Sequence, residues 1–279
     1  TSDDYFHKGV EVHDNYRSNT LIQTVFAPHA PYTVSDPDLA KVSTLAEELD
    51  ISIHMHLHET ANEVSDSRHS DGKSSIQRLH ELGILSPRLI AVHMTSLDQN
   101  DIDLVKASGT HIVHCPESNL KLSSGICPVQ TLTEQGINIA LGTDGAASNN
   151  DLDMFSEMQT AAMLAKIATE NASAMPAADA LQMATLNGAR ALGLEDTIGS
   201  LCVGKSADLI AVDLSALATQ PVYNPISQLV YAACRDQVTD VWVAGKKLLS
   251  NRKLTTINEK SVISDAQEWC EKIRNGKAT

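Results

Sequence analysis

The sequence lacks the features of several large protein classes. It contains no apolar run long enough to span a bilayer, and it does not open with a signal-peptide pattern. Its five cysteines are odd in number and widely scattered, without the CxxC spacing of a structural zinc site or the density of a disulfide scaffold. A formal net charge of -14 argues against a nucleic-acid or membrane-surface partner. We therefore expect a protein of the reducing cytoplasm.

Two phosphate-binding motifs are also missing. Neither G-x-G-x-x-G nor G-x-x-x-x-G-K-[ST] occurs, which argues against a doubly wound nucleotide-binding sheet. The chain begins at Thr1 rather than at a methionine, which indicates a partial sequence. With 279 residues, of which 42% are hydrophobic, it can still bury a sizeable core and fits one large domain or one and a half.

Short apolar runs alternate with helical patterns over the first half of the chain. Five strands are expected, near residues 21–26, 51–58, 89–92, 112–113 and 137–141. Helices are expected at residues 3–15, 36–49, 74–82, 98–107 and 128–135. Polar side chains follow several of the strands, which is typical of a (β/α)₈ barrel of the TIM type. The fold class is thus α/β, with an incomplete barrel in which five of eight strands are visible.

The second half has a different character. Residues 154–170 and 177–192 predict long helices, and the methionines Met154, Met158 and Met163 are expected to fill the core. Residues 199–246 contain short β-branched strands interrupted by glycine, and residues 259–275 predict a charged helix that packs on the surface. We therefore expect a partial barrel at residues 1–195 with strands four to eight, a β-sandwich segment at 196–256 and a C-terminal helix at 257–279.

The chemistry centres on residues 51–64, ISIHMHLHETANEV. In a strand, the alternating His54, His56 and His58 would project to one face, with Glu59 directly after them. A metal ligand and a proton carrier could meet at such a strand end. The alternative is that one or two of these histidines only make hydrogen bonds in a core.

Other polar residues end neighbouring strands. His56, His93, His114 and Asp144 offer imidazoles and a carboxylate that suit a divalent ion such as zinc, and Glu59 could act on a metal-bound water. His93 could equally orient that water. His114 could be a structural group, and Asp144 could simply form a turn.

Four motifs carry a family resemblance. APHAPYT (residues 27–33), HLHETANEV (56–64), HCPESNLKLSSG (114–125) and LGTDGAASNNDLDMFSEM (141–158) together resemble the amidohydrolase superfamily. They are most similar to the 5-methylthioadenosine/S-adenosylhomocysteine deaminases. The resemblance extends over residues 21–249, and the tail is similar to the segment where such enzymes return to a β-sandwich.

The resemblance implies roles for particular residues. His56 and Asp144 correspond to metal ligands, with Asp144 also taking a proton from the bound water. Glu59 corresponds to the acid/base that protonates the purine ring nitrogen, and His93 to the histidine that orients the attacking water. Substrate-binding residues are expected among these and their neighbours, namely His29, Glu59, Asp144 and Ser148. His54 and His58 have no catalytic part in that family.

The family pattern is not complete here. Its first two metal ligands come from an HxH motif on strand one, and no such strand precedes Thr1. The implied metal is zinc, with iron, manganese and nickel left open, and the isolated chain is expected to be inactive. The implied reaction converts 5-methylthioadenosine or S-adenosylhomocysteine to the inosine product and ammonia.

The sequence leaves other functions open. The chain could belong to another amidohydrolase, such as a chlorohydrolase or a guanine or cytosine deaminase, or to a non-catalytic relative. The implied partner is a small nucleoside, with no nucleic acid or membrane, and a homo-oligomer is left open.

Overall fold

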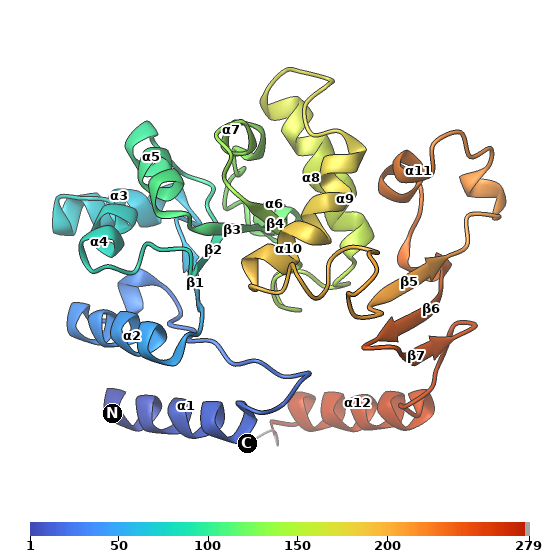
Figure 1. Cartoon of the computed structure of the whole chain (residues 1–279), viewed down its shortest axis with the longest axis horizontal. Helices are drawn as coiled ribbons and strands as arrows, with labels where there is room; N and C mark the ends of the chain where they lie inside the picture. The colour runs from blue at the N-terminus through green and yellow to red at the C-terminus, as the bar shows by residue number, and fades with distance from the viewer. Residues whose placement is uncertain (277–279) are drawn as a thin grey trace.

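A four-stranded parallel sheet organises the first half of the chain. In this computed structural model, which describes residues 1–276, the strand order is β1 (Ile53–Leu57), β2 (Leu89–His93), β3 (His111–His114) and β4 (Ile139–Leu141) (Figure 1). The strand expected at residues 21–26 is reduced to one bridge, between Phe26 and Ile53. Pro28 has no N–H to donate, which interrupts the ladder, and beyond it the N–H of His56 bonds the carbonyl oxygen of His29 at 3.1 Å.

Helices connect the strands and cover the sheet. They are α2 (Asp36–Leu49), α3 (Ala61–Asp71), α4 (Ser75–Glu81), α5 (Gln99–Ser108), α6 (Pro116–Leu122) and α7 (Val129–Glu134). The helices expected from the apolar stripes are confirmed as α2, α4, α5 and α7. The sequence did not predict α3 or α6. In α3 only Val64 is buried, so no apolar stripe marks this helix.

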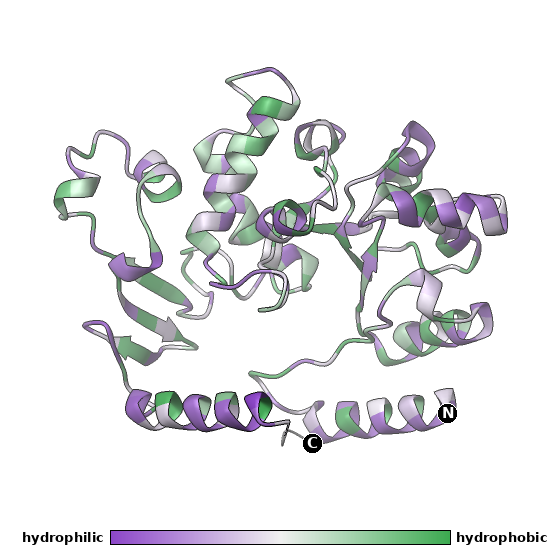
Figure 2. Cartoon of the chain, turned by 180° about the vertical axis from the view of Figure 1, so that it is seen from behind, coloured by the Kyte–Doolittle hydropathy of each residue, from purple (hydrophilic) through white to green (hydrophobic). Residues whose placement is uncertain are grey.

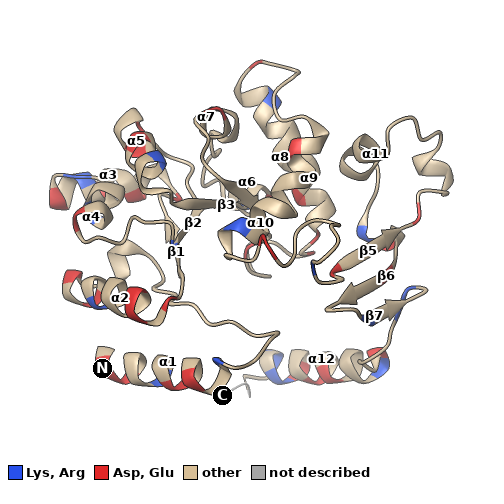
Figure 3. Cartoon of the chain, viewed as in Figure 1, with Lys and Arg blue, Asp and Glu red and all other residues tan. Residues whose placement is uncertain are grey.

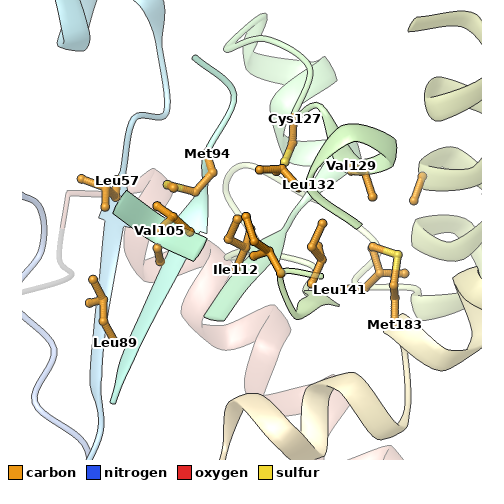
Figure 4. Close-up of a cluster of buried hydrophobic side chains, with 14 of the residues drawn as sticks. Leu57, Leu89, Met94, Val105, Ile112, Cys127, Val129, Leu132, Leu141 and Met183 are labelled. Carbon is orange, nitrogen blue, oxygen red and sulfur yellow. The ribbon is translucent and has the colours of Figure 1, made fainter. Parts of the chain in front are cut away.

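The core lies between the sheet and these helices. Its members come from the strands and the inner helix faces, and a cluster of them is drawn in Figure 4, including Leu57, Leu89, Val105, Ile112, Leu132 and Leu141. The four parallel strands contain no Lys, Arg, Asp or Glu, whereas the outer helices carry many charges (Figure 3). A parallel sheet covered by helices is the α/β arrangement that the sequence predicted.

Three helices follow the parallel sheet, α8 (Met154–Ala168), α9 (Ala177–Met183) and α10 (Leu186–Ala191). The single helix expected over residues 177–192 is therefore wrong, because Thr185 leaves the helical region at φ -130° and ψ -95° and separates α9 from α10. The core role expected of the methionines holds for Met158, which is buried, but Met163 is 53% exposed.

A second, antiparallel sheet stands beside these helices. It is formed by β5 (Leu209–Val212), β6 (Val238–Val243), β7 (Lys246–Ser250) and β8 (Lys253–Leu254), with α11 (Pro225–Tyr231) between β5 and β6 in the chain (Figure 1). This confirms the short β-rich strands expected after residue 199. At the entrance to this region, Gly199 approaches α10 so closely that an added Cβ would lie 2.6 Å from Ala189 Cβ.

The first and last helices have no buried residue. They are α1 (Ser2–Tyr16) and α12 (Glu259–Arg274), and both mix apolar and polar positions along their length (Figure 2). The surface packing expected for the last helix is wrong, because Val262, Ile263, Trp269 and Ile273 are each more than half exposed. None of the helices in residues 1–276 is both long enough and apolar enough to cross a membrane.

Candidate active site

The expected polar residues gather at the carboxyl edge of the parallel sheet. β1 leads into Glu59, β2 ends on His93, β3 ends on His114, and β4 is followed by Asp144. The strands are paired in parallel register, with Leu57 opposite His93, so their carboxyl ends lie at one edge. This edge is where parallel α/β proteins place their chemistry.

Three imidazoles form a row at this edge. The ring centroids of His29 and His56 are 4.7 Å apart, and those of His56 and His93 are 5.4 Å apart in a stacked arrangement. His56 Nδ1 lies 2.8 Å from the backbone oxygen of His29. A carbonyl oxygen can only accept, so Nδ1 carries the proton and Nε2 keeps the lone pair that a metal ligand needs.

Glu59 faces His93 across the edge. Glu59 Oε2 is 3.8 Å from His93 Nε2, and Ser124 Oγ donates a hydrogen bond of 3.0 Å to Glu59 Oε1. On the far side of the imidazole, His93 Nδ1 is 2.8 Å from Asn119 Oδ1. That contact fixes the ring orientation, so the Nε2 of His93 and the carboxyl of Glu59 point toward the same space.

Asp144 is held by three donors. Its Oδ2 accepts hydrogen bonds from Ser118 Oγ at 2.6 Å and from Ser148 Oγ at 2.7 Å, and its Oδ1 accepts one from Gly145 N at 2.7 Å. Burial raises the pKa of Asp144, but the donors together lower it more, so the net shift of this pKa is downward. Asp144 is therefore an anion at neutral pH, and its backbone is left-handed with φ 61°.

The other two alternating histidines lie apart from this group. His54 is on the exposed side of β1, whereas His58 is fully buried, so the expectation that all three histidines share a face is wrong for His58. The strand ends at Leu57, and His58 turns inward with φ 50°. His58 Nδ1 donates to the Ser96 carbonyl at 2.8 Å and lies 3.9 Å from Asp101 Oδ2, which is a structural role.

A cleft of about 1090 Å³ opens beside Glu59. It runs between residues 31–37 and the helices α3 and α4, and Tyr32 and Glu63 line it next to Glu59. His56, His93 and Asp144 are not in its lining, so the cleft reaches one end of the site only.

Comparison with known proteins agrees with this geometry. The family model for the Amidohydrolase family matches residues 6–248. The chain belongs to the amidohydrolase family. This amidohydrolase chain is 51% identical over 271 residues to a 5-methylthioadenosine/S-adenosylhomocysteine deaminase of Teredinibacter turnerae, covering 97% of the chain and 61% of that relative. It is 42% identical over 252 residues to a 5'-deoxyadenosine deaminase of Methanosarcina mazei, covering 90% of the chain and 58% of that relative.

Solved structures share the fold. A zinc-bound adenosine deaminase from Xanthomonas campestris matches with a TM-score of 0.96 and 53% identity, over 98% of this chain and 62% of that one. An atrazine chlorohydrolase from Arthrobacter aurescens with zinc matches with a TM-score of 0.90 over 96% of this chain and 60% of that one, but at 22% identity it shows the fold alone. The amidohydrolase chain thus holds part of a TIM-type barrel and spans about three fifths of the length of these proteins.

His114 differs from the other site residues of this amidohydrolase. It is buried at the end of β3, and neither ring nitrogen has a hydrogen-bond partner within the described residues. Burial lowers the pKa of His114 to about 3, with a smaller contribution from the charge of His93. The imidazole is therefore neutral in the folded protein, and an unpartnered buried ring makes no structural contact that explains it.

The donors present suit zinc in type but are few. His56 offers an imidazole nitrogen and Asp144 a carboxylate, which are typical zinc ligands, whereas a catalytic zinc site has about three protein ligands. No cluster of three or more His, Cys, Asp or Glu side chains within residues 1–276 could hold a metal ion. These residues therefore fit part of a metal site.

Three residues that orient the site were not predicted from the sequence. Ser118 contacts Asp144, Asn119 contacts His93, and Ser124 contacts Glu59. All three lie in HCPESNLKLSSG, directly after a strand that ends on His114. Polar residues that follow a buried strand are a signal that could have indicated them.

Proposed function

We propose that the protein containing this chain deaminates 5-methylthioadenosine and S-adenosylhomocysteine by hydrolysis, giving the inosine product and ammonia. The observation that carries the proposal is the position of His56, Glu59, His93 and Asp144 around the carboxyl edge of the sheet, on the three segments that end or follow β1, β2 and β4. The identity of 51% to a deaminase of that name supports the choice of substrate. A chlorohydrolase is not favoured, because that likeness rests on 22% identity.

Each of these residues has a proposed role that follows from its chemistry. His56 Nε2 and the Asp144 carboxylate would hold zinc, which when bound supplies Lewis-acid activation of water. Glu59 would deliver a proton to the purine ring nitrogen next to the reacting carbon and then assist the departure of ammonia. His93, whose Nε2 faces Glu59, would orient the attacking water, and Asp144 would accept a proton from it.

Substrate contacts would come from residues bordering this edge. His29 stands 4.7 Å from the His56 ring, measured between centroids, and can hydrogen-bond a nucleoside. Ser148 lies on the Asp144 loop and would hold that loop against the substrate.

We place the protein in the cytoplasm, since none of its five cysteines forms a disulfide in the described chain. A homo-oligomer would give a mass in solution that is a multiple of the mass of one chain.

Ammonia release from a panel of compounds tests the proposal. The panel holds S-adenosylhomocysteine, 5-methylthioadenosine, 5'-deoxyadenosine, adenosine, guanine, cytosine and a chlorotriazine, and kcat/KM is measured for each. We expect the two adenosine thioethers to react fastest. A free base or the triazine reacting best would reject the substrate assignment, and 5'-deoxyadenosine reacting best would move it to the activity named for the Methanosarcina relative.

A further inference from the structure

A fully buried carboxyl group lies behind the site and touches none of the residues given a role above. It belongs to Glu157, in the first turn of α8, which has no exposed surface. Buried carboxyl groups are rare because leaving water costs several kcal/mol unless the group is well bonded. Its two oxygens each have one hydrogen-bond partner, and the identities of these partners suggest its purpose.

The two contacts of Glu157 lead to two different loops. Its Oε1 accepts a hydrogen bond of 2.5 Å from Asn149 Nδ2, on the loop that follows β4. Its Oε2 accepts one of 3.2 Å from the backbone N–H of Glu117, at the start of α6 after β3. The carboxyl group therefore joins the segments that follow two adjacent strands of the sheet.

The neighbours of these two contacts meet again on Asp144. Ser148 precedes Asn149, and Ser118 follows Glu117; both serine hydroxyls donate to the same oxygen, Asp144 Oδ2. One buried carboxyl thus bonds the chain neighbour of each of the two serines that donate to Asp144 Oδ2.

We propose that Glu157 is a positioning residue for the proposed metal ligand Asp144, acting through Ser118 and Ser148. The proposal rests on the proposed function for the role of Asp144. The same segment of α6 also carries Asn119, which holds the imidazole of His93. The carboxyl of Glu157 therefore joins the loop that bears Asp144 to the helix whose Asn119 holds His93.

Burial of this group works against the stability of the fold. Burial raises the pKa of Glu157 to about 8, and the charge of nearby Glu117 and Asp151 adds to this, while the two hydrogen bonds oppose it. An apolar side chain of similar volume would avoid the loss of hydration. A residue that costs stability and bonds the chain neighbours of the two serines that hold Asp144 is expected to serve function rather than packing.

Glutamine at this position separates placement from packing. Glu157→Gln keeps the shape but has a single acceptor, so its NH₂ would face either Glu117 N–H or the Asn149 amide. Asn149 cannot invert to accept instead, because its Oδ1 already accepts from the N–H groups of Asp151 and Leu152. One support is lost whichever way the glutamine turns.

The test compares Glu157→Gln with wild type in the protein containing this chain. We expect zinc affinity, measured by competition with a chelator, to fall about 10-fold to 100-fold, the range for losing a group that orients a metal ligand. We expect kcat for 5-methylthioadenosine to fall by a similar factor with KM changed less than about threefold. The variant should stay folded, with a melting temperature lowered by no more than the loss of one buried hydrogen bond explains. Glu48→Gln, on the exposed side of α2, is the matched control and should change none of these values.

A second variant and a double-mutant cycle complete the test. Glu157→Met removes both acceptors and any charge without lost volume, so it decides the matter if Glu157→Gln does not fold. In a cycle with Ser148→Ala, the two losses in zinc affinity should be less than multiplicative, because both changes act on Asp144. Unchanged zinc affinity in folded Glu157→Met, or losses that multiply, would overturn the proposal. If wild type deaminates nothing in the panel, the proposed function fails, and zinc affinity alone still judges Glu157.

Discussion

Replacing Glu59 with glutamine isolates proton transfer from every other role of this residue. Glutamine has the same shape, so it can still accept from Ser124 Oγ, which lies 3.0 Å from Glu59 Oε1. The backbone contact is also kept, because Thr95 Oγ1 donates 2.7 Å to the carbonyl oxygen of residue 59. What the amide cannot do is deliver a proton to a ring nitrogen and recover one.

The expected loss follows from that single deficit. General acid/base groups contribute about 10²-fold to 10⁴-fold to rate, which corresponds to about 2.7–5.5 kcal/mol of transition-state stabilisation. Glu59 lies on the edge of the cleft, 3.8 Å from His93 Nε2, whereas the neighbouring carboxyl of Glu63 accepts from the backbone N–H groups of His58 and Glu59. Turnover of 5-methylthioadenosine by Glu59→Gln should therefore fall at least about a hundredfold.

The assay needs two measurements on the same preparation of the protein containing this chain. Ammonia release gives kcat and KM, and metal analysis gives zinc per chain, which should equal that of wild type because Glu59 is not among the proposed ligands. Glu48→Gln serves again as the exposed control. Near-normal turnover with zinc retained would refute the role of Glu59, and loss of zinc would show that this carboxyl belongs to the metal site instead.

Three further outcomes are expected. The 279-residue chain purified alone should bind well under one zinc and release no ammonia, since His56 and Asp144 are two ligands where about three are needed; stoichiometric metal would show that another histidine completes the set. Burial lowers the pKa of His114 to about 3 in the folded chain from 6.5 in the unfolded chain, so the unfolding free energy should fall as the pH is lowered from 6.5 toward 3. In urea titrations, His114→Phe should reduce the slope of the unfolding free energy against pH in that window by up to about 1.4 kcal/mol per pH unit. An unchanged slope would mean that the His114 ring is accessible to water. Gly199→Ala should lower the unfolding free energy by about 1–3 kcal/mol, because the added Cβ would clash with Ala189 and residue 199 has a φ of 84°. Gly188→Ala, with open space around it, should not destabilise the fold, and equal effects of the two variants would contradict the close approach of Gly199.

The sequence predicted the elements whose signal is local. β2 and β4 are apolar runs with polar residues just beyond them, and their positions and the site residues His93 and Asp144 could be read from those patterns. The strand expected before Pro28 is reduced to the bridge between Phe26 and Ile53, and its apolar run could not show how many of its residues would pair with β1. Propensity could not reveal that Thr185 separates two helices.

The supports of the site were harder to predict than its reactive groups. Glu157 sits in an ordinary helical pattern, DMFSEM, and nothing local distinguishes it from a surface glutamate. Its importance arises from Asn149 and Glu117, which approach it only after two strands have paired. His58 likewise leaves the face of its alternating neighbours because the chain turns at Leu57, and the alternation of side chains cannot show where a strand stops.

The left-handed backbone at the strand ends has a consequence for how this protein responds to selection. His58, His93 and Asp144 have φ of 50°, 79° and 61°, and each such non-glycine residue costs on the order of 1–3 kcal/mol. Together the three residues cost about 3–9 kcal/mol of folding free energy. The net stability of a folded protein is only about 5–15 kcal/mol. Glycine at these positions would relieve the strain, and at His93 and Asp144 it would also remove the side chain to which we assign a role in the reaction. A library screened for heat resistance alone would thus be enriched in substitutions at these strand ends, and its most thermostable members would be the least active.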